Sequence, residues 1–128
     1  MDEDGFIIVH HDDTPLRQDP IAPKGGVASQ VLLECLDAFA KVDIIAPDAS
    51  GIWHSHPNPT IIYIISGYVR VDHGPGFDRI AYAFEGDLIR MPSHWPHRPV
   101  NEMKAHSAQA IVIHLGTTKE CITPLPLE

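Results

Sequence analysis

The sequence predicts an all-β fold, either an antiparallel sandwich or a barrel. Three observations carry this prediction. The length of 128 residues is that of about one domain. From residue 40 onward, short β-branched or alternating segments follow one another between Gly and Pro turns, a pattern typical of antiparallel sandwiches and barrels. The 12 prolines are scattered along the chain, which leaves little room for long helices.

The first 40 residues contain two expected elements. Residues 1–26 are interpreted as an N-terminal arm, in which the apolar residues 6–9 form an edge strand and a polar, proline-rich loop follows. Residues 28–39 allow two interpretations. Their apolar side chains follow helical spacing, with Ser29 as a possible cap. The same stretch also fits two short strands that are broken near residues 34–38.

From residue 40 the expected strands end at turn signals. Clusters of Gly, Pro, Asp and Ser at residues 47–51, 66–67, 73–76 and 85–87 predict turns. Between them, strands are expected over residues 42–46, 60–65, 68–72, 79–84, 88–91 and 107–115. A proline-rich tail follows the last strand.

Charge and hydropathy exclude several classes of protein. The chain has 9 Lys and Arg against 17 Asp and Glu, for a net charge of −8. A nucleic-acid partner requires a basic face, and so does an anionic membrane surface, so we expect neither. The longest apolar run, residues 60–66, is too short to span a bilayer. The acidic N-terminus does not resemble a signal peptide, and Cys35 and Cys121 form no CxxC pair, so we expect a cytoplasmic protein with reduced thiols.

Histidines are the unusual feature of the composition, with 9 in the chain. His54 and His56 lie two residues apart, so on a strand they point to the same side. Two imidazoles on one face are half of a metal site, or two unrelated surface histidines. A neighbouring strand can bring His97 against the pair. Three ligands with open positions are typical of a catalytic metal, and imidazole suits Zn, Fe, Ni, Cu or Mn.

The segment around the first two histidines carries a family resemblance. The pattern Gly51-x2-His54-x-His56-x3-Thr60-x6-Gly67 resembles the first motif of the cupin family, G-x5-H-x-H-x3-4-E-x6-G. The Gly-to-His spacing is shorter here, and Thr60 stands where the family has its glutamate ligand.

A second segment extends the resemblance. The pattern Gly86-x5-Pro92-x-His94-x2-His97-x3-Asn101 is similar to the second cupin motif, G-x5-P-x-G-x2-H-x3-N. His94 stands where the family has glycine, and Asn101 is expected to brace the backbone of the loop. The stretch between the motifs is short, as in microbial single-domain cupins.

The resemblance covers about residues 40–115 and implies a fold. That fold is a double-stranded β-helix, the cupin or jelly-roll barrel, which is usually a homodimer with a metal inside the barrel. It favours strands over a helix for residues 28–39. The expected organisation is an N-terminal arm over 1–26, the barrel over 27–118 and a C-terminal tail over 119–128.

The resemblance also implies the ligand set. The metal ligands are His54, His56 and His97, without a carboxylate, because a neutral hydroxyl at Thr60 is a poor ligand. The cofactor is then a divalent transition metal. Fe(II) is favoured because three-His cupins include diketone-cleaving and thiol dioxygenases, while Zn, Ni, Mn and Cu remain possible. Three neutral ligands leave the full charge on the metal, which favours anionic, chelating substrates.

Several neighbours of the motifs are candidates for the substrate pocket. Thr60, Ile62 and Ile64 share the parity of the ligands, so Thr60 is expected to face the barrel interior and the two isoleucines to form an apolar pocket floor. Trp53 and Trp95 each lie next to a motif histidine. They wall the pocket and exclude water, or they pack the ends of the barrel.

Other polar residues have open roles. His94 is a fourth ligand, a base beside the metal or an exposed corner residue, and the last is favoured. Gln109 is a candidate substrate contact on the last strand, whereas His114 is expected to point outward at the end of that strand. Arg90 and Arg98 pair with a substrate carboxylate or are ordinary surface charges, which we favour.

These residues predict a metal-dependent enzyme that acts on a small organic molecule. Its most concrete form is a three-His, non-haem Fe(II) dioxygenase. The alternatives are a hydrolase or isomerase that uses Zn or Mn as a Lewis acid, and a non-catalytic module that binds a metal or a ligand.

Overall fold

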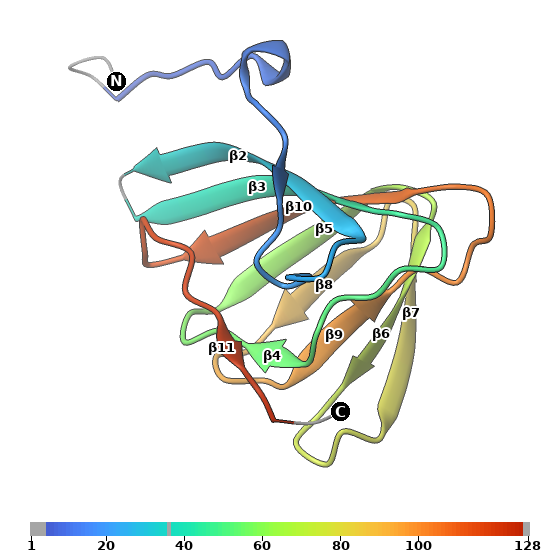
Figure 1. Cartoon of the computed structure of the whole chain (residues 1–128). Helices are drawn as coiled ribbons and strands as arrows, with labels where there is room; N and C mark the ends of the chain where they lie inside the picture. The colour runs from blue at the N-terminus through green and yellow to red at the C-terminus, as the bar shows by residue number, and fades with distance from the viewer. Residues whose placement is uncertain (1–4, 36, 127–128) are drawn as a thin grey trace.

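The computed structural model describes residues 5–35 and 37–126, and their regular structure is almost entirely β (Figure 1). One short 3-10 turn, η1 (His11–Asp13), precedes the first strand. The strands are β1 (Arg17–Gln18), β2 (Val27–Cys35), β3 (Ala38–Ile45), β4 (His54–Ser55), β5 (Thr60–Ser66), β6 (Tyr68–His73), β7 (Arg79–Phe84), β8 (Leu88–Met91), β9 (His97–Val100), β10 (Ala108–Leu115) and β11 (Thr123–Pro124). No helix in the described ranges is long and apolar enough to cross a membrane.

The strands form two sheets that face each other. One sheet has the order β1-β2-β3-β10-β5-β8 and the other has the order β11-β4-β9-β6-β7. Neighbouring strands pair antiparallel throughout, for example β10 between β3 and β5. Strands far apart in sequence are therefore neighbours in both sheets, and the all-β prediction is confirmed.

The helical interpretation of residues 28–39 is wrong. Residues 28–35 belong to strand β2, and residues 38 and 39 begin strand β3. In β3 every second side chain is buried, including Phe39, Lys41, Asp43 and Ile45. This period of two belongs to a strand. In β2 the alternation is less regular, and its pairing with β3 shifts register between Val31 and Leu33, so the apolar spacing of residues 28–35 does not reveal a strand.

The arm and the tail both pair with the barrel strands. Residues 6–9 form no strand, and the edge strand of the arm is β1, which pairs with β2 through Arg17–Ser29 and Gln18–Ala28. In the tail, β11 pairs with β4, so that Pro124 lies opposite His54 (Figure 1). The boundaries at residues 26 and 118 stay a prediction.

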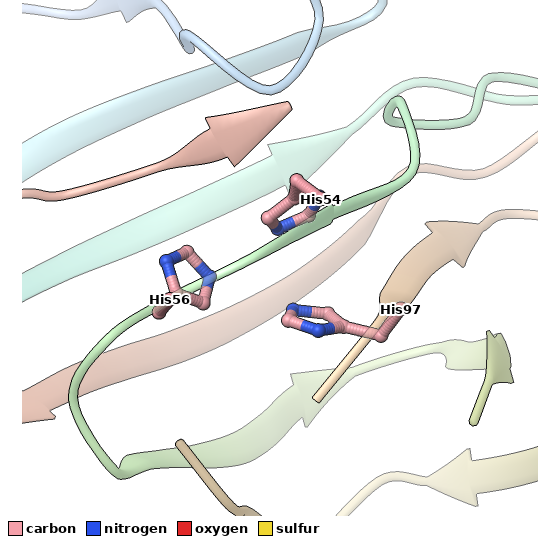
Figure 2. Close-up of side chains that lie close together, drawn as sticks. All are labelled: His54, His56 and His97. Carbon is pink, nitrogen blue, oxygen red and sulfur yellow. The ribbon is translucent and has the colours of Figure 1, made fainter. Parts of the chain in front are cut away.

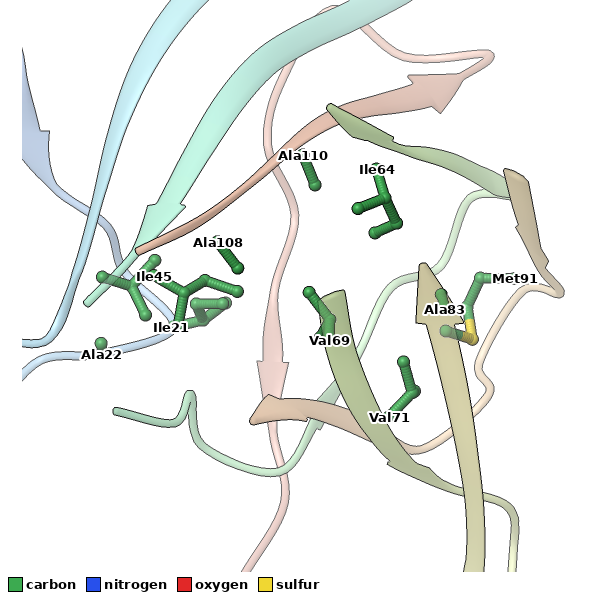
Figure 3. Packing of buried hydrophobic residues seen from close by; sticks show 11 residues of the cluster. Ile21, Ala22, Ile45, Ile64, Val69, Val71, Ala83, Met91, Ala108 and Ala110 are labelled. Atoms are coloured by element: carbon green, nitrogen blue, oxygen red, sulfur yellow. The ribbon is translucent and has the colours of Figure 1, made fainter. Parts of the chain in front are cut away.

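The apolar core lies between the two sheets. Figure 3 shows how side chains from both layers, among them Ile64, Val69 and Ala110, meet in the interior. Burying an aliphatic side chain of this size stabilises a fold by about 1.5–3 kcal/mol. The complete buried cluster is Ile21, Ala22, Val27, Ile45, Ile64, Val69, Val71, Ala83, Met91, Ala108 and Ala110.

Two motif residues hold the turns at one end of the sandwich. Gly67, between β5 and β6, has φ +74°, a left-handed conformation that strains a residue with a side chain, and an added Cβ would also require Cε of Met103, 2.6 Å away, to move. Asn101 donates from Nδ2 to the carbonyl oxygens of Ile45, Ala46 and His106 at 3.0, 3.2 and 2.9 Å. Its expected role as a backbone brace is thus confirmed.

Candidate metal centre

Three buried imidazoles from two strands meet at one point (Figure 2). The register of β4 against β9 pairs His54 directly with His97, and His56, two residues after His54, comes immediately after β4. One ring nitrogen from each of the three residues lies within 4.8 Å of the others. The ring centroids of His54 and His97 are 4.3 Å apart. These are the three residues that the two motifs indicated.

Each of these rings is fixed through its Nδ1. The Nδ1 of His54 lies 2.7 Å from the carbonyl oxygen of Ile52, and that of His97 lies 2.8 Å from the carbonyl oxygen of Trp95. The Nδ1 of His56 lies 2.9 Å from the carbonyl oxygen of Cys121 in the tail. A carbonyl only accepts, so each Nδ1 carries the proton. The Nε2 lone pairs are left as donors, which is how metal-ligating histidines are usually oriented.

Burial keeps the three rings neutral. Desolvation is the main cause in each case, and it lowers the pKa of His97 to about 4. Desolvation, followed by the neighbouring imidazoles of His97 and His56, holds the pKa of His54 well below its usual value. Burial also lowers the pKa of His56. Neutral imidazole is the form that binds a metal, so the residues fit a metal ion.

A fourth imidazole lies beside the three, and sequence reasoning placed it wrongly. His114 was expected to point outward, but it is 1% exposed and its ring centroid is 4.4 Å from that of His56. The ring stacks on Phe39. Desolvation, and then the neighbouring His56, lowers the pKa of His114 to about 3. The available signal was strand parity, because His114 shares the parity of Ala108.

Thr60 holds this fourth ring. In the β5–β10 register Thr60 lies opposite His114, and its Oγ1 lies 2.7 Å from the Nδ1 of His114. The same hydroxyl donates to the carbonyl oxygen of Asn58 at 3.2 Å, so it is free to accept from the Nδ1–H. The Nε2 of His114 is buried and has no hydrogen-bond partner among the described residues. It therefore presents a fourth lone pair.

The four imidazoles line one cavity of about 50 Å³. Ile62 and Ile64 lie in its wall, as expected for the pocket floor, together with Val112 and Met91. Since one water needs about 10–15 Å³ of such space, the cavity has room for an ion and a few water-sized groups. Only a small substrate, or the reactive end of a larger one, fits inside.

Two charged side chains also reach this cavity, and sequence reasoning missed both. Lys41 and Asp43 lie on β3 and line the cavity, and both are buried. Their parity matches that of the buried Phe39 and Ile45. That parity was the only sequence signal, because charged residues in a strand usually face solvent.

Neither tryptophan lines the cavity that contains the imidazoles. Trp53 is buried and makes an edge contact with Phe77 at 4.9 Å, while the Arg98 guanidinium lies 5.4 Å from its ring centroid. Trp95 donates from Nε1 to the Nδ1 of His73 at 3.1 Å. Both side chains therefore pack against other residues and do not form the wall of this cavity. Trp53 precedes His54, so on a strand it points to the opposite face.

Three further candidates lie away from the cavity. His94 is exposed with φ +63°, a left-handed conformation that explains why the related motif carries glycine there. Its backbone N–H donates to the carbonyl oxygen of His56 at 2.6 Å. Gln109 alternates with the inward Ala108 and so faces away from the cavity. Arg90 is exposed, and Arg98 donates to Asp72 at 2.8 Å.

Comparison with known sequences gives one family. A model described as Cupin domain matches residues 42–114 of the chain. The matched range includes both motifs and all four imidazoles. No curated protein matches the sequence.

Solved structures share this architecture at low sequence identity. The polyketide cyclase RemF from Streptomyces resistomycificus has a TM-score of 0.81 and 16% identity, over 96% of this chain and 87% of that chain. An RmlC-like cupin from Shewanella frigidimarina has a TM-score of 0.70 and 20% identity, over 84% of this chain and 88% of that chain. Oxalate decarboxylase OxdC from Bacillus subtilis has a TM-score of 0.74 and 20% identity, but the match over 90% of this chain spans just 31% of that chain. At these identities the likeness is one of fold.

Proposed function

Because the chain belongs to the Cupin domain family, we propose that it is a metal-dependent enzyme that acts on a small organic molecule. The observation that supports this most directly is the convergence of three imidazole nitrogens within 4.8 Å at one cavity. The cavity is otherwise mainly apolar. Apolar walls around a few convergent polar groups are typical of a site for a small molecule.

His54, His56 and His97 would hold the metal, and His114 would be a fourth donor. All four present Nε2 with Nδ1 engaged elsewhere. Imidazole donors suit a divalent transition metal. Fe(II) is favoured from the three-His resemblance, with Zn, Ni, Mn and Cu as the other choices. Such an ion supplies Lewis acidity and, as Fe(II), a place for O2.

The most concrete reaction is the oxidation of a small chelating substrate by O2, as in a non-haem Fe(II) dioxygenase. In this reaction Ile62, Ile64 and Val112 would pack against the hydrocarbon part of the substrate and exclude water. Thr60 would keep His114 oriented.

A second candidate reaction is proton transfer at a carbonyl compound, as in an isomerase or a hydrolase that uses Zn or Mn. The observation that favours it is the pair Lys41 and Asp43 in the cavity wall. A buried carboxyl group beside the substrate is a general acid or base, and oxygen chemistry does not require one.

Metal analysis of freshly purified protein tests the proposal, with His97→Ala as the variant. We expect the wild type to retain a stoichiometric metal and the variant to lose it, because the variant lacks one of the three converging donors. His94→Asn is the matched control, since His94 is exposed and asparagine tolerates its left-handed backbone. Metal content that survives His97→Ala would contradict the ligand assignment.

Oxygen uptake then separates the two reactions. Fe(II)-loaded protein should consume O2 with a β-diketone, a thiol or a catechol-like compound if it is a dioxygenase. Turnover without O2 would favour the Lewis-acid reaction. A bound metal without turnover over a broad panel would indicate a non-catalytic binding module.

Partners and location stay predictions. We expect a homodimer, a small-molecule substrate, no nucleic-acid or membrane partner, and a cytoplasmic protein. Light scattering coupled to gel filtration measures the oligomeric state.

A further inference from the structure

A buried cluster of charged side chains lies where the arm, β3 and the tail meet. The Lys41 ammonium lies 2.5 Å from Oδ2 of Asp19 in the arm and 2.7 Å from Oε2 of Glu120 in the tail. It also lies 3.2 Å from Oδ1 of Asp43 on its own strand. All four side chains are at most 9% exposed. Arg17 on β1 completes the cluster, at 2.6 Å from Glu120.

The charges of this cluster do not balance. Three carboxylates face two cations, Lys41 and Arg17, so full ionisation leaves one surplus negative charge. An unpaired buried charge costs several kcal/mol, and a carboxyl group avoids the cost by taking up a proton. The imbalance therefore favours the uptake of a proton by one carboxyl group of the cluster.

The contacts indicate which carboxyl group carries that proton. Asp19 accepts hydrogen bonds from Lys41 and from the N–H of Ile21, and Glu120 accepts one from Arg17. The Oδ1 of Asp43 and the Oε2 of Glu120 are both buried and accept no hydrogen bond from the described residues, but the other carboxylate oxygen of Glu120 accepts the one from Arg17. Its ion-pair distance to Lys41 is also the longest of the three.

The electrostatics agree with these contacts. Burial raises the pKa of Asp43 to about 7, with Lys41 opposing the shift and Asp19 adding to it. Burial also acts to raise the pKa of Asp19, but the charge and hydrogen bond of Lys41 outweigh it and the pKa is lowered. The raised pKa makes both the protonated and the ionised form of the Asp43 carboxyl group accessible near neutral pH.

Asp43 is also the carboxyl group of the cluster that lines the metal cavity. In the sheet it lies in a row with Ala110 and Ile64, whose side chains line the same space. The titratable and charged groups around it come from several elements: Lys41 on β3, Arg17 and Asp19 from the arm, Glu120 from the tail, and, at the cavity, His54, His56, His97 and His114.

We propose that Asp43 is the catalytic residue that exchanges a proton with the substrate, and that the substrate is a small enolisable carbonyl compound. The inference rests on the proposed metal-dependent function and names its chemistry. The Asp43 carboxylate takes a proton from the carbon next to the carbonyl group. That C–H bond breaks and an O–H bond forms on Asp43, while the C–H electron pair becomes the C=C bond and the π pair of the carbonyl group moves onto its oxygen. Return of a proton from Asp43 to the same carbon reverses these bond changes and completes the exchange of that hydrogen without an oxidant.

Hydroxyacetone is a suitable probe because it is small, uncharged, enolisable and able to chelate a metal through two oxygens. Metal-loaded wild type in D2O should accelerate the exchange of its carbon-bound hydrogens, as followed by proton NMR. The exchange rate should be at least about 100-fold lower in Asp43→Asn than in the wild type, which is the lower end of the usual effect of a general base. In Asp43→Glu the rate should lie between those of the wild type and Asp43→Asn. Metal content should stay unchanged in both variants.

Asp72→Asn is the matched control. Asp72 is likewise a buried aspartate, but it pairs with Arg70 and Arg98 away from the cavity. We expect the Asp72→Asn variant to exchange the hydrogens of hydroxyacetone at the same rate as the wild type. Infrared difference spectra provide a readout that is independent of turnover: a protonated carboxyl band at pH 6 should weaken by pH 8 and be absent from Asp43→Asn.

The outcomes separate this inference from the proposed function. A wild type that binds no metal contradicts the proposed function itself. Metal-loaded wild type that fails to accelerate exchange, an Asp43→Asn variant that exchanges as fast as the wild type, or a carboxyl group that is ionised throughout pH 6–8 would each overturn the role of Asp43 alone.

Discussion

The hydroxyl oxygen of Thr60 lies 2.7 Å from the Nδ1 of His114. The residue at the glutamate position of the first motif therefore contacts an imidazole. Its hydroxyl group orients His114, whereas a glutamate at this position is a metal ligand in the family motif. The parity of the two paired strands brings both side chains to the interior. The neutral substitution thus holds a fourth imidazole, from β10, beside that of His56.

Thr60→Val should weaken metal binding by about 10- to 100-fold, the usual effect of removing a residue that orients a ligand. Loss of the partner of a buried Nδ1–H should also destabilise the protein by about 1–3 kcal/mol. Metal competition titrations and urea unfolding measure the two effects. Thr118→Val, at an exposed position, is the control. Unchanged affinity would show that His114 does not contribute to the metal centre.

His94→Gly should stabilise the protein by about 1 kcal/mol, because a left-handed backbone costs a residue with a side chain about 1–2 kcal/mol. The φ of His94 is +63° and the side chain is exposed. Urea unfolding checks the stability, and metal analysis should show full retention. Loss of the metal in this variant would instead indicate that the His94 side chain contributes to the centre.

The metal-free protein should lose stability as the pH falls below about 6.5, the ordinary histidine value. The folded-state pKa values of His97 and His114 are lowered to about 4 and about 3. Between these values and 6.5 the unfolded chain binds more protons, so stability rises with pH in this window. Melting temperatures from pH 4 to 8 with a chelator present test this. His106→Ala, at an exposed site, should show the same dependence, and a flat profile would contradict the assignment.

Asp43→Asn should be more stable than the wild type at pH 8 and similar to it at pH 4. Burial raises the folded-state pKa of Asp43 to about 7, so the stability that its protonated form provides is lost as the pH rises through this value. The amide has no such loss. Asp72→Asn should show the opposite sign, because the hydrogen bonds of Arg98 and Arg70 outweigh burial and lower the pKa of Asp72. Urea midpoints at the two pH values decide between these outcomes.

Lys41→Met should destabilise the protein by about 3–5 kcal/mol at neutral pH, the usual cost of breaking a buried ion pair from one side. Asp19, Asp43 and Glu120 would lose their shared cation. Part of the stability should return at low pH, where the carboxyl group of Asp43 is protonated. Lys104→Met removes an exposed ion pair with Asp48 and should leave unfolding unchanged. A mild effect of Lys41→Met would mean that the cluster is more hydrated than its burial indicates.

Strand positions and the three histidines were predictable because both depend on local spacing. β5, β6 and β7 lie at the expected alternating or β-branched segments, and the ligand candidates follow from the two motifs. The inward side of a strand was harder to predict where it carries polar residues. His114, Lys41 and Asp43 have the parity of buried neighbours, but their residue types usually face water.

Contacts that form when distant segments dock had no local signal. The carbonyl oxygen of Cys121 orients His56, yet a backbone oxygen is the same in any sequence. Glu120 reaches Lys41 across the end of the sandwich, and nothing in the tail composition indicates it. Trp53 was left open between a pocket wall and packing at the barrel end, because it adjoins His54, although strand alternation turns neighbours to opposite faces.

The position of the tail links the metal site to the last step of folding. The carbonyl oxygen of Cys121 in the tail fixes His56, and β11 lies against the strand that carries His54. A chain whose last segment has not yet docked therefore lacks an aligned donor, however complete its barrel. Metal uptake should accordingly occur late in folding, and the kinetics of metal capture would report when the protein closes that end.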